Sequence, residues 1–264
     1  MKNIRICVCI FAILVSSVSV LGAQSLKGMS LNGSTGLFSI PSARIGWERT
    51  SDFGLDLGYH TIFRNKATHI PAISMSLFKW VELSGAFDIQ PGKNQSDILT
   101  GAKIQFPLTN TAIALGGNFT AMNPGNDNHD LRYCAGQVYV AVTYAGTFFN
   151  MPAETTAVLG KTFIQNRDID GNIDFGMGFD LILLPNVFQN SVHWIMDFAN
   201  FSYSVEAWGA DANYRGVLNT GIRIDLSVIP ALSKFKFAVD ILMTDAFDNS
   251  RSFSAGLVFG VPIL

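Results

Sequence analysis

The sequence predicts an all-β protein: a single up-and-down antiparallel transmembrane β-barrel of about twelve strands, following a cleaved signal peptide. Between residues 53 and 262, segments of about ten residues alternate apolar side chains with polar or very small ones. The segments are joined by polar loops and by short turns in strict alternation. The chain is 48% hydrophobic but only 14% charged, whereas soluble domains average about 25% charged residues. A large lipid-facing surface would account for this excess of apolar residues.

The first 23 residues have the features of a secretory signal peptide. Lys2 and Arg5 form a positive region, residues 6–21 are apolar, and small residues precede a cleavage site before Gln24. We therefore expect three parts: a signal peptide at 1–23, a periplasmic N-terminal segment or lumen plug at 24–50, and the barrel at 51–264. Removal of the signal would leave Cys134 without a partner for an internal disulfide.

The strand prediction depends on a period of two. At its start, Phe53, Leu55 and Leu57 alternate with polar or small residues that include Asp56. The same pattern recurs in residues 81–90, 113–120, 173–183, 222–228 and 235–241. A soluble sandwich would alternate in the same way, but the signal peptide, the low charge and the strand length favour a membrane barrel. A membrane helix over residues 133–153 is disfavoured, because glycines, Asn150 and Pro152 interrupt it.

The connections predict which ends of the strands face outward. The polar loops are residues 64–66, 92–95, 126–130, 167–172, 210–215 and 245–250; the short turns are 78–80, 107–110, 150–152, 185–187 and 230–232. Outer-membrane barrels place long loops outside and short turns in the periplasm.

Residues 191–208 change apolar parity near Ala199. A single strand with a bulge there gives twelve strands and two periplasmic termini. Fourteen strands is the alternative, if part of residues 26–49 joins the sheet.

Two short stretches resemble known outer-membrane proteins. Residues 252–261 resemble the terminal strand of barrels from Gram-negative bacteria and spirochaetes, although the chain ends in Leu264 rather than Phe or Trp. That resemblance implies insertion by the barrel assembly machinery. Residues 33–44 resemble the entry motif of YjbH-like outer-membrane proteins, a family associated with exopolysaccharide export. Both resemblances imply an outer-membrane location.

Charged residues on the polar strand faces are the candidate functional residues. By parity we expect them to line the lumen: Asp56, Glu82, Asp88, Asp97, Lys103, Lys161, Asp174, Asp180, Glu206, Arg223, Asp225, Lys236 and Asp240. Twelve strands enclose more room than eight, so the prediction is a narrow water-filled channel for small solutes, with an acidic excess that favours cations. The alternative is a surface-exposed structural or adhesive barrel with a plugged lumen, in which the same charges pair.

Enzymatic and cofactor chemistry receive little support from the sequence. Ser191, His193 and Asp197 share one strand face, but residues two apart on a strand are about 7 Å apart, too far for direct bonding. We therefore predict no enzyme and no cofactor. One calcium site is conceivable from oxygen-ligand spacing, at Asp168, Asp170, Asn172 and Asp174, although these residues also suit a plain hairpin turn.

The expected partners are membrane lipid, the barrel assembly machinery and small solutes. A net charge of −2 and an isoelectric point near 6.0 provide no basic surface for nucleic acid.

Overall fold

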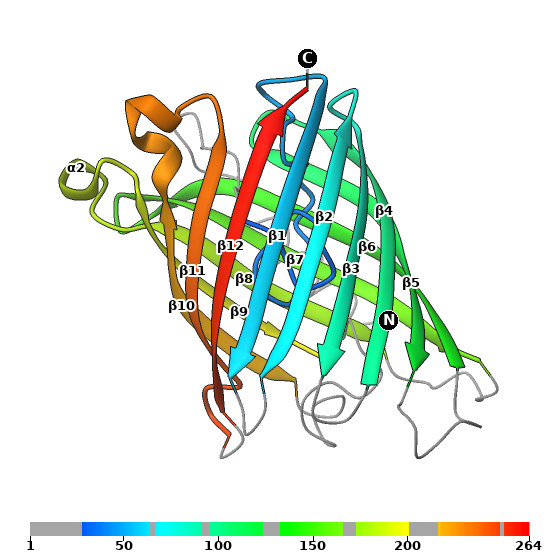
Figure 1. Ribbon diagram of the computed structural model, residues 1–264. Helices are drawn as coiled ribbons and strands as arrows, with labels where there is room; N and C mark the ends of the chain where they lie inside the picture. The colour runs from blue at the N-terminus through cyan, green and yellow to red at the C-terminus, as the bar shows by residue number, and fades with distance from the viewer. Residues whose placement is uncertain are drawn as a thin grey trace, which may run out of the picture.

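The chain folds into a closed antiparallel β-barrel (Figure 1). The computed structural model describes residues 28–63, 67–90, 95–123, 133–165, 173–200, 216–248 and 251–263. Each strand pairs with its neighbours in sequence, and β1 pairs with β12 to close the barrel. The predicted fold class is therefore confirmed. Among these residues, no helix is both long enough and apolar enough to cross a membrane.

The barrel has twelve strands, as predicted. Their bounds are β1 Phe53–Phe63, β2 Thr68–Leu77, β3 Val81–Gln90, β4 Gln95–Pro107, β5 Thr111–Asn123, β6 Tyr133–Phe148, β7 Met151–Ile164, β8 Asp174–Ile182, β9 Val192–Ala199, β10 Val217–Asp225, β11 Lys236–Thr244 and β12 Ser252–Pro262. The alternative of fourteen strands is wrong. Residues 28–50 contribute only two isolated bridges, Met29 to Thr35 and Gly36 to Pro41, and no strand of the barrel.

The short turns lie where the sequence placed them. Phe78 and Lys79 between β2 and β3, and Phe149 and Asn150 between β6 and β7, have positive φ angles of 48–63°. Successive left-handed residues form the tight turn whose twist matches antiparallel strands. The β8–β9 connection forms one helical turn, α2 (Pro185–Phe188). The polar loops at 64–66, 126–130, 167–172 and 210–215 lie largely or wholly outside the described residues.

Strand β10 ends earlier than the sequence predicts. The apolar alternation suggested a strand through Val228, but β10 ends at Asp225. Two short 3₁₀ helices follow, η2 (Leu226–Val228) and η3 (Pro230–Leu232). The Asp225 carboxylate accepts hydrogen bonds from the backbone N–H (2.9 Å) and hydroxyl (2.5 Å) of Ser227. This local cap turns the chain out of the sheet.

Strand β9 covers the first part of the strand predicted over residues 191–208. It pairs with β10 over Val192–Ala199 and with β8 over His193–Ala199. The predicted bulge falls at the end of this pairing, and the remainder of the expected strand lies outside the described residues, as does the predicted signal peptide.

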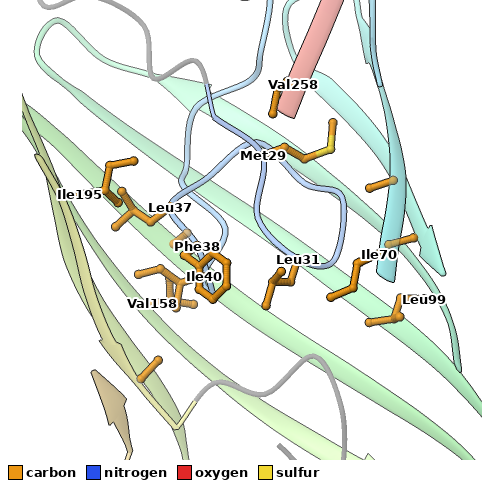
Figure 2. Packing of buried hydrophobic residues seen from close by; sticks show 14 of the residues in the cluster. Met29, Leu31, Leu37, Phe38, Ile40, Ile70, Leu99, Val158, Ile195 and Val258 are labelled. Carbon is orange, nitrogen blue, oxygen red and sulfur yellow. The ribbon is translucent and has the colours of Figure 1, made fainter. Parts of the chain in front are cut away.

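Residues 28–48, hereafter the N-terminal segment, lie inside the barrel and appear as the dark blue trace in Figure 1. Met29, Leu37, Phe38 and Ile40 of the segment have at most 1% of their surface exposed. Figure 2 shows these side chains beside inward-facing residues of the strands. The barrel therefore has a hydrophobic core of its own, packed around the segment.

Candidate functional site

The two faces of the barrel wall have opposite chemistry. Large apolar side chains are exposed on the outer face all around the barrel, among them Leu57, Phe87, Leu115, Leu159, Met177, Ile241 and Leu257. The alternate positions are buried and carry most of the charge. A closed barrel leaves no unpaired backbone groups for hydrocarbon, and its apolar outer face suits lipid. This is the architecture of an outer-membrane β-barrel, and its interior is the candidate functional site.

Glu82 and Lys103 form an ion pair that holds the N-terminal segment. Glu82 on β3 lies directly opposite Lys103 on β4, and their charged atoms are 3.0 Å apart. Glu82 also accepts hydrogen bonds of 2.8 Å from the Ser34 hydroxyl and the Thr35 backbone N–H. Lys103 donates to the carbonyls of Thr35 (2.9 Å) and Ser42 (3.0 Å). The pair thus hydrogen-bonds to three backbone groups of the segment: the N–H and carbonyl of Thr35 and the carbonyl of Ser42.

A second ion pair joins the two sides of the closing seam. Lys236 on β11 lies 2.6 Å from Asp56 on β1. The other oxygen of Asp56 accepts a 2.8 Å hydrogen bond from the indole N–H of Trp47. The Lys236 ammonium also lies 5.3 Å from the centre of the Trp47 ring, within cation–π range. Trp47 is therefore fixed at the point where the segment leads into β1.

The third cluster lies on β8, β9, β10 and β11. The Arg223 guanidinium makes two 2.8 Å hydrogen bonds to Asp240, one to each carboxylate oxygen. Asp180 lies 3.6 Å from Arg223 and 2.6 Å from the Nδ1 atom of His193. Arg223 also reaches the Gly36 carbonyl of the segment at 3.4 Å. Fork-shaped pairing of this kind fixes the geometry of both buried side chains.

Asp197 binds the backbone of the segment directly. One of its oxygens accepts 2.8 Å hydrogen bonds from the backbone N–H groups of Phe38 and Ser39, and the other accepts from the Ser39 hydroxyl (2.8 Å) and Asn219 (2.7 Å). Sequence reasoning placed Asp197 on the inner face but did not assign it this role. The sequence indicated its inward position, because Asp197 has the same parity as His193. No sequence pattern indicated its partners in the segment, which lie about 160 residues away in the chain.

Three further contacts to the segment were missed. Arg44 lies 3.6 Å from Glu154 on β7, Ala43 donates its N–H to Thr143 at 2.8 Å, and His60 donates to the Met29 carbonyl at 3.1 Å. Glu154 has the same parity as the buried residues Thr156 and Val158 of β7, so parity could have identified it.

The hypothetical Ser191, His193 and Asp197 arrangement is not assembled. Ser191 donates to the Phe188 carbonyl, while His193 pairs with Asp180 and Asp197 with the segment. These three residues therefore have separate structural partners.

The remaining predicted residues occupy varied positions. Asp88 and Asp97 are buried and lie opposite each other on β3 and β4, and buried Asp225 caps η2. Lys161 differs from the prediction: it lies opposite Val138, whose side chain is exposed on the outer face, so Lys161 takes outward parity. Residues directly opposite in an antiparallel pair share one face of the sheet. Glu206 lies outside the described residues.

The calcium hypothesis can be followed at one residue. Asp174 accepts hydrogen bonds from Thr162 (2.6 Å) and Gln137 (3.0 Å) on the inner wall. Asp168, Asp170 and Asn172 lie outside the described residues. Within the described ranges, no group of three His, Cys, Asp or Glu residues is arranged to hold a metal ion.

Comparison with known proteins identifies structural neighbours only. No known family model matches the chain, and no curated protein is significantly similar in sequence. Among solved structures, the KdgM porin superposes with a TM-score of 0.51 at 8% sequence identity, over 79% of this chain and 99% of KdgM. A structure of KdgM with disordered oligogalacturonate gives the same values. The Acinetobacter baumannii outer membrane protein Omp33 covers 81% of this chain and 98% of its own, with 11% identity and a TM-score of 0.45. The KdgM likeness shows that the two chains share a fold.

Proposed function

We propose that the protein is an outer-membrane channel for small solutes, narrowed by its own N-terminal segment. The observation that carries this proposal is the closed twelve-strand barrel, with an apolar outer face and a strongly charged inner wall. The fold shared with the KdgM porin supports it. Solutes would pass through the part of the lumen that the segment leaves unfilled.

Cation preference is part of the proposal. The inward acids of the described strands are Asp56, Glu82, Asp88, Asp97, Glu154, Asp174, Asp180, Asp197, Asp225 and Asp240, and the inward bases of the same strands are Lys103, Arg223 and Lys236. A fixed negative excess along a low-dielectric wall raises the local concentration of cations.

Conductance in planar bilayers is the decisive experiment. The mature protein should produce current steps above the lipid baseline, and a potassium chloride gradient should give a reversal potential of the sign expected for cations. Changing Asp88→Asn and Asp97→Asn together should move that potential toward zero, because it removes two adjacent fixed charges. Unaltered selectivity in the double variant would remove the cation proposal while leaving the channel proposal intact.

The second candidate is a structural or adhesive barrel whose interior stays closed. It is favoured by the apolar contacts that fill the space between the wall and the segment. A folded, membrane-inserted protein that passes no current would support this candidate and overturn the channel.

Export and insertion follow from the same proposal. Residues 1–23 would direct secretion, and the barrel assembly machinery would insert the strands, with membrane lipid as the surrounding partner. The fold shared with the KdgM porin supports a function without catalysis.

A further inference from the structure

We propose that the N-terminal segment is a permanent core of the barrel and is not displaced when the protein works. This inference does not depend on whether solutes pass. It concerns residues 28–48, all of which lie within the described part of the chain.

The apolar residues of the inner wall provide the first argument. Ile62, Ile70, Leu99, Val158, Ile195, Leu242 and Val258 point inward and have at most 3% of their surface exposed. In a water-filled lumen these positions would favour polar side chains, since apolar surface in contact with water is unfavourable. Figure 2 shows several of them around Met29, Leu31, Leu37, Phe38 and Ile40. Removal of the segment would expose both halves of this core to water.

The shape of the wall provides the second argument. A Cβ atom at Gly58 would lie 2.4 Å from the Met29 sulfur, and one at Gly54 would lie 2.2 Å from the Trp47 ring. Similarly, a Cβ at Gly176 would approach the Ile40 side chain to 2.6 Å. On two strands, the wall therefore has glycine at positions where a larger residue would collide with the segment. Such close fitting is typical of a packed interior.

The charged residues of the wall provide the third argument. Glu82 and Asp197, on opposite sides of the strand order, accept hydrogen bonds from backbone N–H groups of the segment. Lys103 and Arg223 donate to its carbonyls. Departure of the segment would break these bonds on several strands at once and leave buried polar groups without partners. A displaceable plug would be expected to have one contact region that can open first.

Cysteine labelling tests whether the segment leaves the barrel. We would prepare Ile40→Cys in a Cys134→Ser background, fold it in liposomes and add a water-soluble maleimide. The control is Thr109→Cys in the same background, because Thr109 lies exposed in the β4–β5 turn. The control should label fully, and Ile40→Cys should label at least about 100-fold more slowly, since exchange would require the core to open. Comparable rates would overturn the proposal.

A disulfide lock tests the same point during transport. The Cβ positions of Ile40 and residue 176 are 3.6 Å apart, which suits a disulfide. In the Cys134→Ser background, Ile40→Cys combined with Gly176→Cys should therefore bond the segment to β8. Conductance should be the same before and after reduction; current that appears only on reduction would overturn the proposal. If neither form conducts, the channel proposal fails, and the labelling rate still decides whether the segment is permanent.

Discussion

Single residues of the inner wall act mainly as partners for the backbone of the segment. Glu82 has 1% of its surface exposed, pairs with Lys103 and accepts the Thr35 N–H. A backbone that forms neither helix nor strand has N–H and carbonyl groups that require partners when it is buried. Charged wall residues supply them in this barrel, so the charges that parity places inside stabilise a chain segment.

Removing the Glu82 carboxylate should therefore destabilise the barrel strongly. Glu82→Ala would leave the Lys103 ammonium buried without its counter-ion, at a cost of about 3–5 kcal/mol. The free energy of unfolding in urea, measured on protein folded in lipid, would test this. Asp52→Ala is the control, because the Lys79–Asp52 pair is exposed and worth less than about 1 kcal/mol. Equal effects of the two substitutions would contradict the structural role of Glu82.

Arg223 offers a test of geometry at constant charge. Arg223→Lys keeps the positive charge but cannot make the two parallel hydrogen bonds to Asp240. We expect a loss of about 1–3 kcal/mol in the free energy of unfolding, from the hydrogen bonds to charged groups that lysine cannot replace. A lysine variant as stable as the original protein would show that charge alone suffices at this position.

At the scale of elements, the strands were predictable from the sequence, whereas the sequence left open whether residues 24–50 form a periplasmic segment or a lumen plug and did not indicate the contacts of the segment. The period of two in β1, β3 and β8 comes from contacts with lipid on one side and with the interior on the other. The sequence of each strand alone therefore indicates which of its residues face outward. The N-terminal segment has no such period. Its partners, such as Asp197 for Phe38 and Arg223 for Gly36, are far away in sequence. Local patterns contain no information about such pairs.

The same distinction explains the other differences. Parity placed Asp56, Glu82, Asp180 and Asp240 on the inner face, but parity does not show whether water or a packed chain lies opposite. Likewise, apolar alternation continues through Leu226 and Val228 although Asp225 caps a 3₁₀ turn there. A side chain that hydrogen-bonds to the nearby backbone competes with strand pairing, and the alternation of apolar residues does not reveal this competition.

Deleting the segment should prevent the barrel from folding. A chain without residues 28–48 would expose its inward apolar residues to water and lose the partners of its wall charges. We expect it to lack the heat-dependent shift in gel migration that marks a folded barrel. Adding a synthetic peptide of residues 28–48 during refolding should restore part of the shift. A deleted chain that folds as well as the full chain would contradict the role of the segment.

At the scale of the whole molecule, the barrel has two apolar surfaces, one against lipid and one around the segment. The alternation of polar loops and short turns predicts the orientation of the barrel in the membrane. Accessible tags at Asn126, Asn172 or Asn249 should be reached by antibody on intact cells, because polar loops face outward in such barrels. Tags at Thr109 or Ala231 should require permeabilised cells. Equal labelling of both sets would contradict the assigned orientation.

The closing seam between β1 and β12 has a consequence for the order of assembly. Met29 bonds to His60 on β1 and packs in one cluster with Val258 on β12. The segment comes first in the chain, and β12 is the last strand to be synthesised. We expect the segment to be in place before β12 pairs with β1, because its apolar side chains pack in one cluster with residues of both strands. Time-resolved crosslinking of Ile40→Cys to Gly176→Cys should therefore precede β1–β12 pairing. In this order of assembly, the strands form around the N-terminal segment, and pairing of β12 with β1 closes the barrel last.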